Sequence, residues 1–245
     1  MLVAAAVCPC PPLLVPEVAS GAAPELDSAR AACVDALGVL AAARPDRLMV
    51  IGLVPEEPEP GTYPQGTRGS FRGFGVDLEV HLGAARSAAE PAPPASAAPL
   101  PLSLAVGAWL LERTGWADAP IEGRAVGEPF DAEWCIKIGR EIAGGPDERV
   151  ALLVMGDASA CRTLKAPGYL DPRAEPYDTA LAQALGAADV AALKALDPGL
   201  SRELKVSGRA PWQVLAGAAE DAGLSGTLLY EEAPYGVGYL VATWS

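Results

Sequence analysis

Histidine is almost absent from this chain: one residue, His81, stands among 245. Because histidine is the commonest metal ligand and the usual proton carrier at neutral pH, a site built on several imidazoles is excluded. Basic residues are also scarce, with 18 lysines and arginines against 31 acidic residues and a net charge of −13. Such a charge repels phosphate backbones, so nucleic acid is not an expected partner.

Long apolar runs are missing as well. No run reaches the ~18 residues of a membrane-spanning helix without a break, so no membrane association is expected. The opening "MLVAAAV" has no basic region before it, and prolines follow it, so it predicts a buried strand and not a signal peptide. The five cysteines are odd in number and lie in unlike contexts, which favours a reducing compartment over a disulfide framework. We therefore expect a cytoplasmic protein.

The hydrophobic pattern alternates between strands and helices. An apolar strand at 2–7, a helix at 24–43 and a strand at 47–54 make a βαβ unit. The pattern predicts further helices at 102–114, 131–143, 176–196 (two, broken near Gly186) and 211–222, and further strands at 149–157, 226–232 and 236–244. The predicted fold class is α/β, with a central, mostly parallel sheet flanked by helices.

One low-complexity stretch interrupts the pattern. Residues 87–101, "SAAEPAPPASAAPLP", form a Pro/Ala-rich connector. Neither side of it shows a complete fold, so we expect it to lie inside a single domain that spans residues 1–245.

Three loops follow predicted strands: "CPCPPLL", "LVPEEPEPGTYPQG" and "GDASACRT". Ligands of open α/β sheets bind beyond the carboxyl ends of the strands, so these loops are expected to meet there. Their site-lining candidates are Cys10, Asp157, Ser159 and Cys161.

The Cys-x-Cys pair allows two interpretations. Cys8 and Cys10 point the same way on an extended segment and, with Asp157 and Cys161, would make a thiolate and carboxylate set suited to Zn(II). The spacing favours a simpler interpretation, because no second Cys or His pair stands at metal spacing. Cys8 is then a small core residue, and Cys10 is a free thiol that lines a cleft.

Three arginines are candidates for ligand binding. Arg68 and Arg72 lie in the glycine-rich "GTYPQGTRGSFRGFG", and Arg162 follows Asp157 closely. Guanidinium groups in such places bind carboxylates or phosphates. The alternative for all three is ion pairing with neighbouring acids.

Four segments, "CPCPPLLVPE", "VMGDASACRTLKAPGYLDPRAEPYD", "VSGRAPWQVLAGA" and "APYGVGYLVA", occur in this order. Together they resemble the catalytic B subunits of class III extradiol ring-cleavage dioxygenases and the related MEMO-type proteins. The resemblance implies that family's fold, a non-haem ferrous ion that opens catechol-type rings with oxygen, and association as a homodimer or with a second subunit.

The chain departs from that family at the metal. Cys10 and Ala160 stand where the family has histidines, and the second strand is followed by none. Ser207 replaces the cysteine that opens the corresponding MEMO segment. Ferrous oxygenases need imidazole and carboxylate ligands. The expected function is therefore an extradiol dioxygenase-like protein that has lost its iron site, holds no cofactor or metal, and binds a small aromatic or anionic molecule or a partner. The alternative is a metal-dependent dioxygenase for a catechol-type substrate, with Fe(II) or Zn(II) in an altered Cys/Asp site. Whether the protein is an enzyme stays open at this point.

Overall fold

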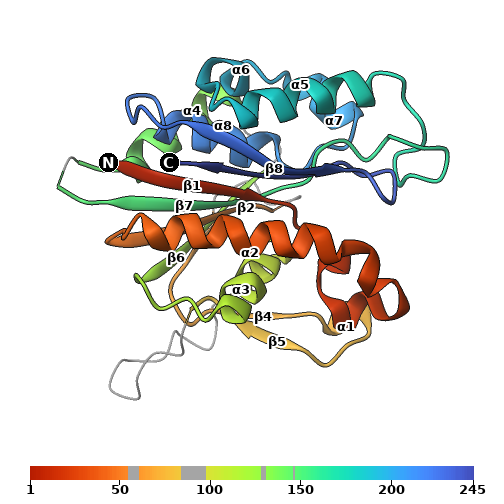
Figure 1. Ribbon diagram of the computed structural model, residues 1–245, viewed down its shortest axis with the longest axis horizontal. Coiled ribbons are helices and arrows are strands. Elements are labelled where there is room, and N and C mark those ends of the chain that lie inside the picture. Colours follow the sequence, from red (N-terminus) through yellow and green to blue (C-terminus); the bar gives the residue numbers. More distant parts are fainter. Residues whose placement is uncertain (55–60, 84–97, 128–130, 146) are drawn as a thin grey trace.

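The computed structural model describes residues 1–54, 61–83, 98–127, 131–145 and 147–245. A seven-stranded sheet, with the order β3-β6-β2-β7-β1-β9-β8, crosses the molecule (Figure 1). Its strands are β1 (Leu2–Cys8), β2 (Arg47–Val54), β3 (Gly61–Tyr63), β6 (Ile121–Gly127), β7 (Val150–Met155), β8 (Gly226–Glu232) and β9 (Tyr239–Trp244). A second, two-stranded sheet pairs β4 (Arg68–Ser70) with β5 (Glu79–His81).

The sheet is parallel in its centre and antiparallel toward its edges. Strands β6, β2, β7 and β1 run parallel to one another. Strand β3 is antiparallel to β6, β9 to β1, and β8 to β9. The predicted α/β class with a helix-flanked central sheet is confirmed. The sequence predicts a mostly parallel sheet. In the structure, parallel pairing joins the four strands β6, β2, β7 and β1, and the other three strands pair in antiparallel fashion.

Helices cover both faces of the sheet (Figure 1). On one face lie α2 (Asp27–Ala42) and α3 (Leu102–Thr114), with the small β4–β5 sheet beyond α3. The other face carries α4 (Ala132–Ala143), α5 (Ala174–Gly186), α6 (Val190–Lys194), α7 (Pro198–Glu203) and α8 (Arg209–Ala218). A short helix, α1 (Pro16–Ala19), and 3-10 turns at Pro12–Leu14 and Ser20–Leu26 connect β1 to α2.

Alternating side chains of β1 divide the interior into two cores. Because successive residues of a strand point to opposite faces, Ala4, Ala6 and Cys8 enter the core beneath α2 and α3. Ala5 and Val7 enter the core beneath α4 and α8, and Leu2 joins them because the register of β1 shifts between Leu2 and Ala4. The sheet thus separates the side chains that enter the core beneath α2 and α3, cysteines included, from those that enter the core beneath α4 and α8.

The predicted elements are found with shifted ends. Strand β2 has the expected bounds, the segment 176–196 breaks after Gly186 into α5 and α6, and α8 stops at Ala218 instead of 222. Strands β3, β4, β5 and β6 are not among the predicted elements. In β6, the longest of them, Glu122 and Arg124 interrupt the apolar pattern.

Two further predictions concern the whole chain. The connector at 87–101 lies outside the described residues, apart from 98–101, and the single-domain prediction stays a prediction. No helix in the described part of the chain has both the length and the apolar character needed to cross a membrane.

Candidate functional site

The loops after β1 and β7 leave the sheet side by side. These strands are parallel neighbours in which Cys8 lies opposite Met155, and the amide of Gly156 donates to the carbonyl of Cys8 at 3.0 Å. Just beyond, the amide of Cys10 donates to Oδ1 of Asp157 at 2.8 Å. Two of the three predicted loops therefore meet at the carboxyl edge of the parallel strands. Part of the third, 55–60, lies outside the described residues.

The loop before α8 joins them. The amide of Asp157 donates to Oγ of Ser207 at 2.9 Å, and the amide of Gly208 donates to the carbonyl of Asp157 at 3.0 Å. A Cβ atom on Gly156 would lie 2.4 Å from the Cα of Gly208, so the two backbones approach this closely because Gly156 has no side chain. The sequence-predicted residues Cys10, Asp157 and Ser207 are thus brought together.

Tyr239 is a fourth residue of this group, beside Cys10, Asp157 and Ser207, and was not among the site residues predicted from the sequence. In the antiparallel pairing of β1 with β9, Val7 lies opposite Ala242, and continuing this register sets position 239 opposite position 10. The side chain is 2% exposed. Burial and then the charge of Asp157 raise the pKa of the Tyr239 phenol. The sequence contains one signal for Tyr239, because this residue lies in "APYGVGYLVA", one of the four segments that resemble the ring-cleavage dioxygenases. Cys10, Asp157, Ser207 and Tyr239 are called the strand-end cluster below.

The surroundings of the strand-end cluster favour the protonated, uncharged forms of its titratable side chains, Asp157, Cys10 and Tyr239. Burial raises the pKa of Asp157 to about 7, against the opposing effect of the Cys10 amide, although this residue keeps partial solvent exposure. Burial and then the charge of Asp157 raise the pKa of the Cys10 thiol well above its ordinary value, while a hydrogen bond with Ser207 lowers it. The carboxyl group can thus donate or accept a proton near neutral pH, and Cys10 remains a thiol and not a nucleophilic thiolate.

Ser159 and Arg162 belong to a different network. The amide and hydroxyl of Ser159 donate to the two carboxylate oxygens of Asp178 at 2.9 and 2.8 Å. Nη1 of Arg162 donates to Oδ2 of Asp178 at 3.1 Å. Ser159 is 0% exposed and Asp178 1%. These groups hold the loop after β7 to α5, so the structure does not bring Ser159 into the strand-end cluster.

The four-residue metal set does not converge. Cys8 and Cys10 enter the core beneath α2, whereas Cys161 enters the opposite core, where its thiol donates to the carbonyl of Leu204 at 3.4 Å. Hydrogen bonding with the Cys33 thiol and burial raise the pKa of Cys8 well above its ordinary value. Within the described ranges no group of three or more His, Cys, Asp or Glu side chains could hold a metal ion.

The alternative of a Cys8, Cys10, Asp157 and Cys161 site for Fe(II) or Zn(II) is therefore corrected: the residues present do not fit the metal. The single histidine does not change this, since His81 lies on β5 with its Nδ1 3.8 Å from Oε1 of Glu112 on α3.

The remaining candidate arginines lie in the small sheet and its connection. Arg72 pairs with Asp77 at 2.7 Å and with Glu79 at 3.3 Å, which is the ion-pairing alternative named above. Arg68 is exposed on β4. Neither arginine has a contact with the strand-end cluster among the described residues.

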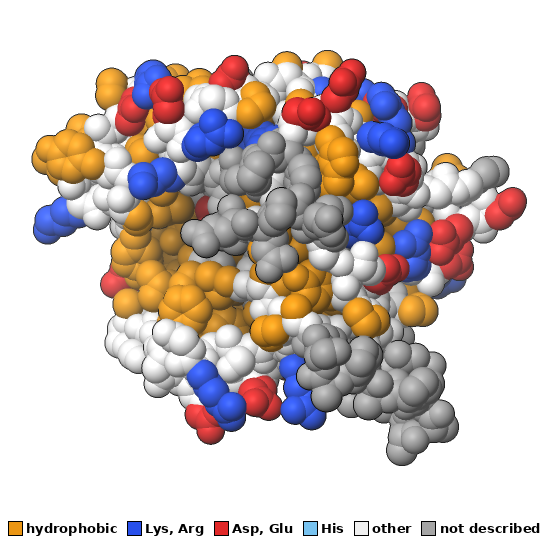
Figure 2. Space-filling model, turned by 180° about the vertical axis from the view of Figure 1, so that it is seen from behind, with side chains coloured by type: hydrophobic (Ala, Val, Ile, Leu, Met, Phe, Trp, Pro, Cys, Tyr) orange, Lys and Arg blue, Asp and Glu red, His pale blue; other side chains and the backbone are white. Residues whose placement is uncertain are grey.

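Hydrophobic side chains gather in a hollow on the face seen in Figure 2, between the layer of α4 to α8 above the sheet and the layer of α2 and α3 below it. Charged side chains concentrate on the upper and lower rims of this face. A largely apolar depression with a charged rim is a common form of a small-molecule site.

Comparisons with known proteins bear on the fold. No protein-family model matches the chain, and the search of curated proteins gave no match. Among solved structures, an uncharacterized protein, JW3007, from Escherichia coli K12 is similar, with a TM-score of 0.56 and 15% sequence identity over 99% of this chain and 100% of that chain. At this identity the likeness concerns the fold alone, and the chain shares its α/β architecture with that protein over nearly its whole length.

Proposed function

We propose that the protein binds a small, uncharged aromatic molecule that carries a hydroxyl group, at the strand-end cluster, and that it does not open the ring. The observation that carries this proposal is the Cys10 amide bound to the partly exposed carboxyl of Asp157, whose pKa is raised to about 7. Such a carboxyl group, beside a neutral thiol and a neutral phenol, suits a hydroxyl group that both donates and accepts a hydrogen bond.

Two observations support an uncharged ligand over an anionic one. Arg72 and Arg162 are engaged by carboxylates, namely Asp77 and Glu79 for the former and Asp178 for the latter. An anionic ligand would also be repelled by the negative charge that Asp157 carries when it ionises. The aromatic character rests on the resemblance of the four family-like segments to ring-cleavage dioxygenases.

The donor set supports a protein that does not open the ring. The Cys10 thiol beside Asp157 favours its protonated state, and Cys161 lies in the other core. All five cysteines are free, which supports the cytoplasmic setting that we propose with this function.

Isothermal titration with catechol, phenol and benzoate tests the proposal. Catechol and phenol are expected to bind, and benzoate is expected to bind at least tenfold more weakly. Asp157→Ala is expected to lower the affinity for catechol by about tenfold, as loss of a hydrogen bond to a buried polar group does. Asp77→Asn, in the connection between β4 and β5, is the matched control. Equal binding of catechol by Asp157→Ala and the wild type would overturn the site.

A second arm addresses the chemistry. The protein is incubated with Fe(II), oxygen and catechol, and the absorbance of a ring-opened product is followed. A product whose formation is lost in Cys10→Ala and Asp157→Ala would overturn the non-catalytic proposal and favour the altered metal site.

A further inference from the structure

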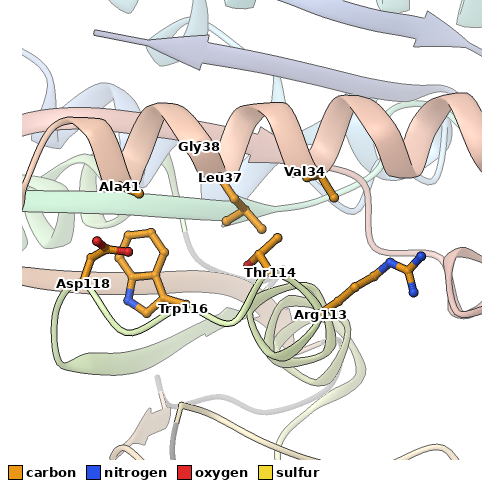
Figure 3. A pocket seen from close by; sticks show the side chains of 8 residues that line it. All are labelled: Val34, Leu37, Gly38, Ala41, Arg113, Thr114, Trp116 and Asp118. Carbon is orange, nitrogen blue, oxygen red and sulfur yellow. The ribbon is translucent and has the colours of Figure 1, made fainter.

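A groove lies between α2 and the end of α3, far in the sequence from the strand-end cluster. Its volume is about 290 Å³. Figure 3 shows α2 along one side and the C-terminal end of α3 with the following loop along the other. Because α2 leads into the start of β2, and this loop into the start of β6, the groove lies at the amino edge of the parallel strands. It is therefore a separate place from the carboxyl edge that holds the strand-end cluster.

One face of α2 supplies an apolar wall. Val34, Leu37, Gly38 and Ala41 stand at positions i, i+3, i+4 and i+7, which share a helix face. Leu37 is buried, whereas Val34 is 39% exposed and so offers apolar surface to a ligand. A Cβ atom on Gly38 would have no heavy atom within 4 Å, so the missing side chain leaves room above the helix.

The opposite wall carries an aromatic ring and a carboxylate. The indole Nε1 of Trp116 donates to the carbonyl of Ala119 at 3.0 Å, which fixes the ring in the loop. The carboxylate of Asp118 lies next to that ring in Figure 3 and is exposed. The electron-rich face of an indole and a neighbouring carboxylate both attract a cation.

Arg113 marks the far end of the groove. Its side chain extends away from Trp116 in Figure 3, and its guanidinium lies 5.5 Å from the ring centroid of Trp109. Neither Arg113 nor Asp118 takes part in an ion pair with another described residue. The groove is thus negative beside Trp116 and positive at its other end, which disfavours a second positive charge on a ligand.

We propose that this groove binds a small organic monocation, with its ammonium group beside Trp116 and Asp118 and its apolar body over Gly38 and Val34. The span from Val34 to Ala41 is about 10 Å at a helical rise of ~1.5 Å per residue, which suits an arylalkylamine with one ring. The net charge of −13 raises the concentration of cations near the surface.

Titration with 2-phenylethylammonium tests the proposal, followed by the indole N–H signal of Trp116 in two-dimensional NMR, which Trp116→Phe assigns. The amine is expected to shift this signal. The anion 3-phenylpropionate and the dication 1,6-hexanediammonium are expected to bind at least fivefold more weakly.

Two variants test the location of the ligand and the role of the charge separately. Gly38→Leu fills the groove and Asp118→Asn removes its charge, and each is expected to raise the Kd for the amine at least fivefold. Asp77→Asn is the charge control, and Gly38→Ala is a smaller filler should Gly38→Leu disturb folding. Unchanged affinity in the Gly38 variants would overturn the location. Equal affinity for the amine and the propionate would overturn the ligand class.

Discussion

The backbone amide of Cys10 donates a 2.8 Å hydrogen bond to a carboxylate oxygen of Asp157, a residue 147 positions further along the chain. This bond joins the loops that follow two neighbouring parallel strands. It also couples the conformation of the cysteine loop to a carboxyl group whose pKa is raised to about 7.

The first prediction concerns stability against pH. The native pKa of Asp157 is about 7, and that of an aspartate in an unfolded chain is about 3.9. Between these values the native state keeps a proton that the unfolded state has released, so the free energy of unfolding falls as the pH rises from about 4 to 7 and then levels off.

Asp157→Asn cannot ionise and removes this contribution. The difference in unfolding free energy between the variant and the wild type is expected to change by on the order of 2 kcal/mol from pH 5 to 7.5, measured by urea unfolding. Parallel pH profiles for the two proteins would contradict the raised pKa. Asp77→Asn, which removes an exposed acid between β4 and β5, serves as the control.

The second prediction concerns the reactivity of Cys10. The charge of Asp157 raises the pKa of this thiol and the Ser207 hydrogen bond lowers it. Alkylation by iodoacetamide at pH 8 is therefore expected to be about threefold or more faster in Asp157→Asn and slower in Ser207→Ala, because the thiolate is the reacting species. Peptide mapping by mass spectrometry measures both rates. Cys8, fully buried in the same peptide, is the internal reference, and equal rates in all three proteins would refute the coupling.

The third prediction compares two glycines. A Cβ atom on Gly208 would lie 2.1 to 2.5 Å from atoms of the Trp212 ring, so Gly208→Ala is expected to destabilise the protein by about 1–3 kcal/mol. Gly38→Ala, with open space around the new atom, is expected to stabilise α2 by about 0.5–1 kcal/mol. Chemical unfolding gives both values. A stable Gly208→Ala would mean that the loops are not packed as described.

The fourth prediction compares a buried ion pair with an exposed one. Asp178→Ala leaves the buried Ser159 hydroxyl without its acceptor and removes the buried partner of Arg162, which keeps only the exposed Glu175, and a loss of about 3 kcal/mol is expected. Asp77→Ala breaks the exposed pair with Arg72 and is expected to cost under about 1 kcal/mol. Thermal unfolding ranks the two variants. Similar losses would show that the Asp178 network does not anchor the loop after β7.

Much of the sheet could be predicted because its central strands are continuous apolar runs. Strands β1, β2 and β7 contain no interior charge, and such runs read clearly as buried parallel strands. Strand β6 was missed although it is equally central, since Glu122 and Arg124 alternate with small residues. Its identity depends on pairing with β2, which is a tertiary property.

The candidate site could be predicted only in part. The rule that loops meet at the carboxyl edge correctly brought Cys10 and Asp157 together. Which side of the sheet a loop residue enters depends on local backbone geometry, so Cys161 and Ser159, only a few residues beyond Asp157, turned into a different core and a different network. Tyr239 reaches the strand-end cluster through the antiparallel pairing of β9 with β1, a tertiary contact to which only the segment "APYGVGYLVA" pointed.

The place of β1 between β7 and β9 has a consequence for biosynthesis. This strand, without a single charged side chain, is synthesised before its antiparallel neighbour, which follows about 230 residues later, roughly 10 to 50 seconds at bacterial and eukaryotic elongation rates. Throughout that interval one hydrogen-bonding edge of an apolar strand stays open to other nascent chains. Expression should therefore depend on chaperones that shield emerging polypeptides, and a chain released before residue 239 should aggregate where the full chain folds.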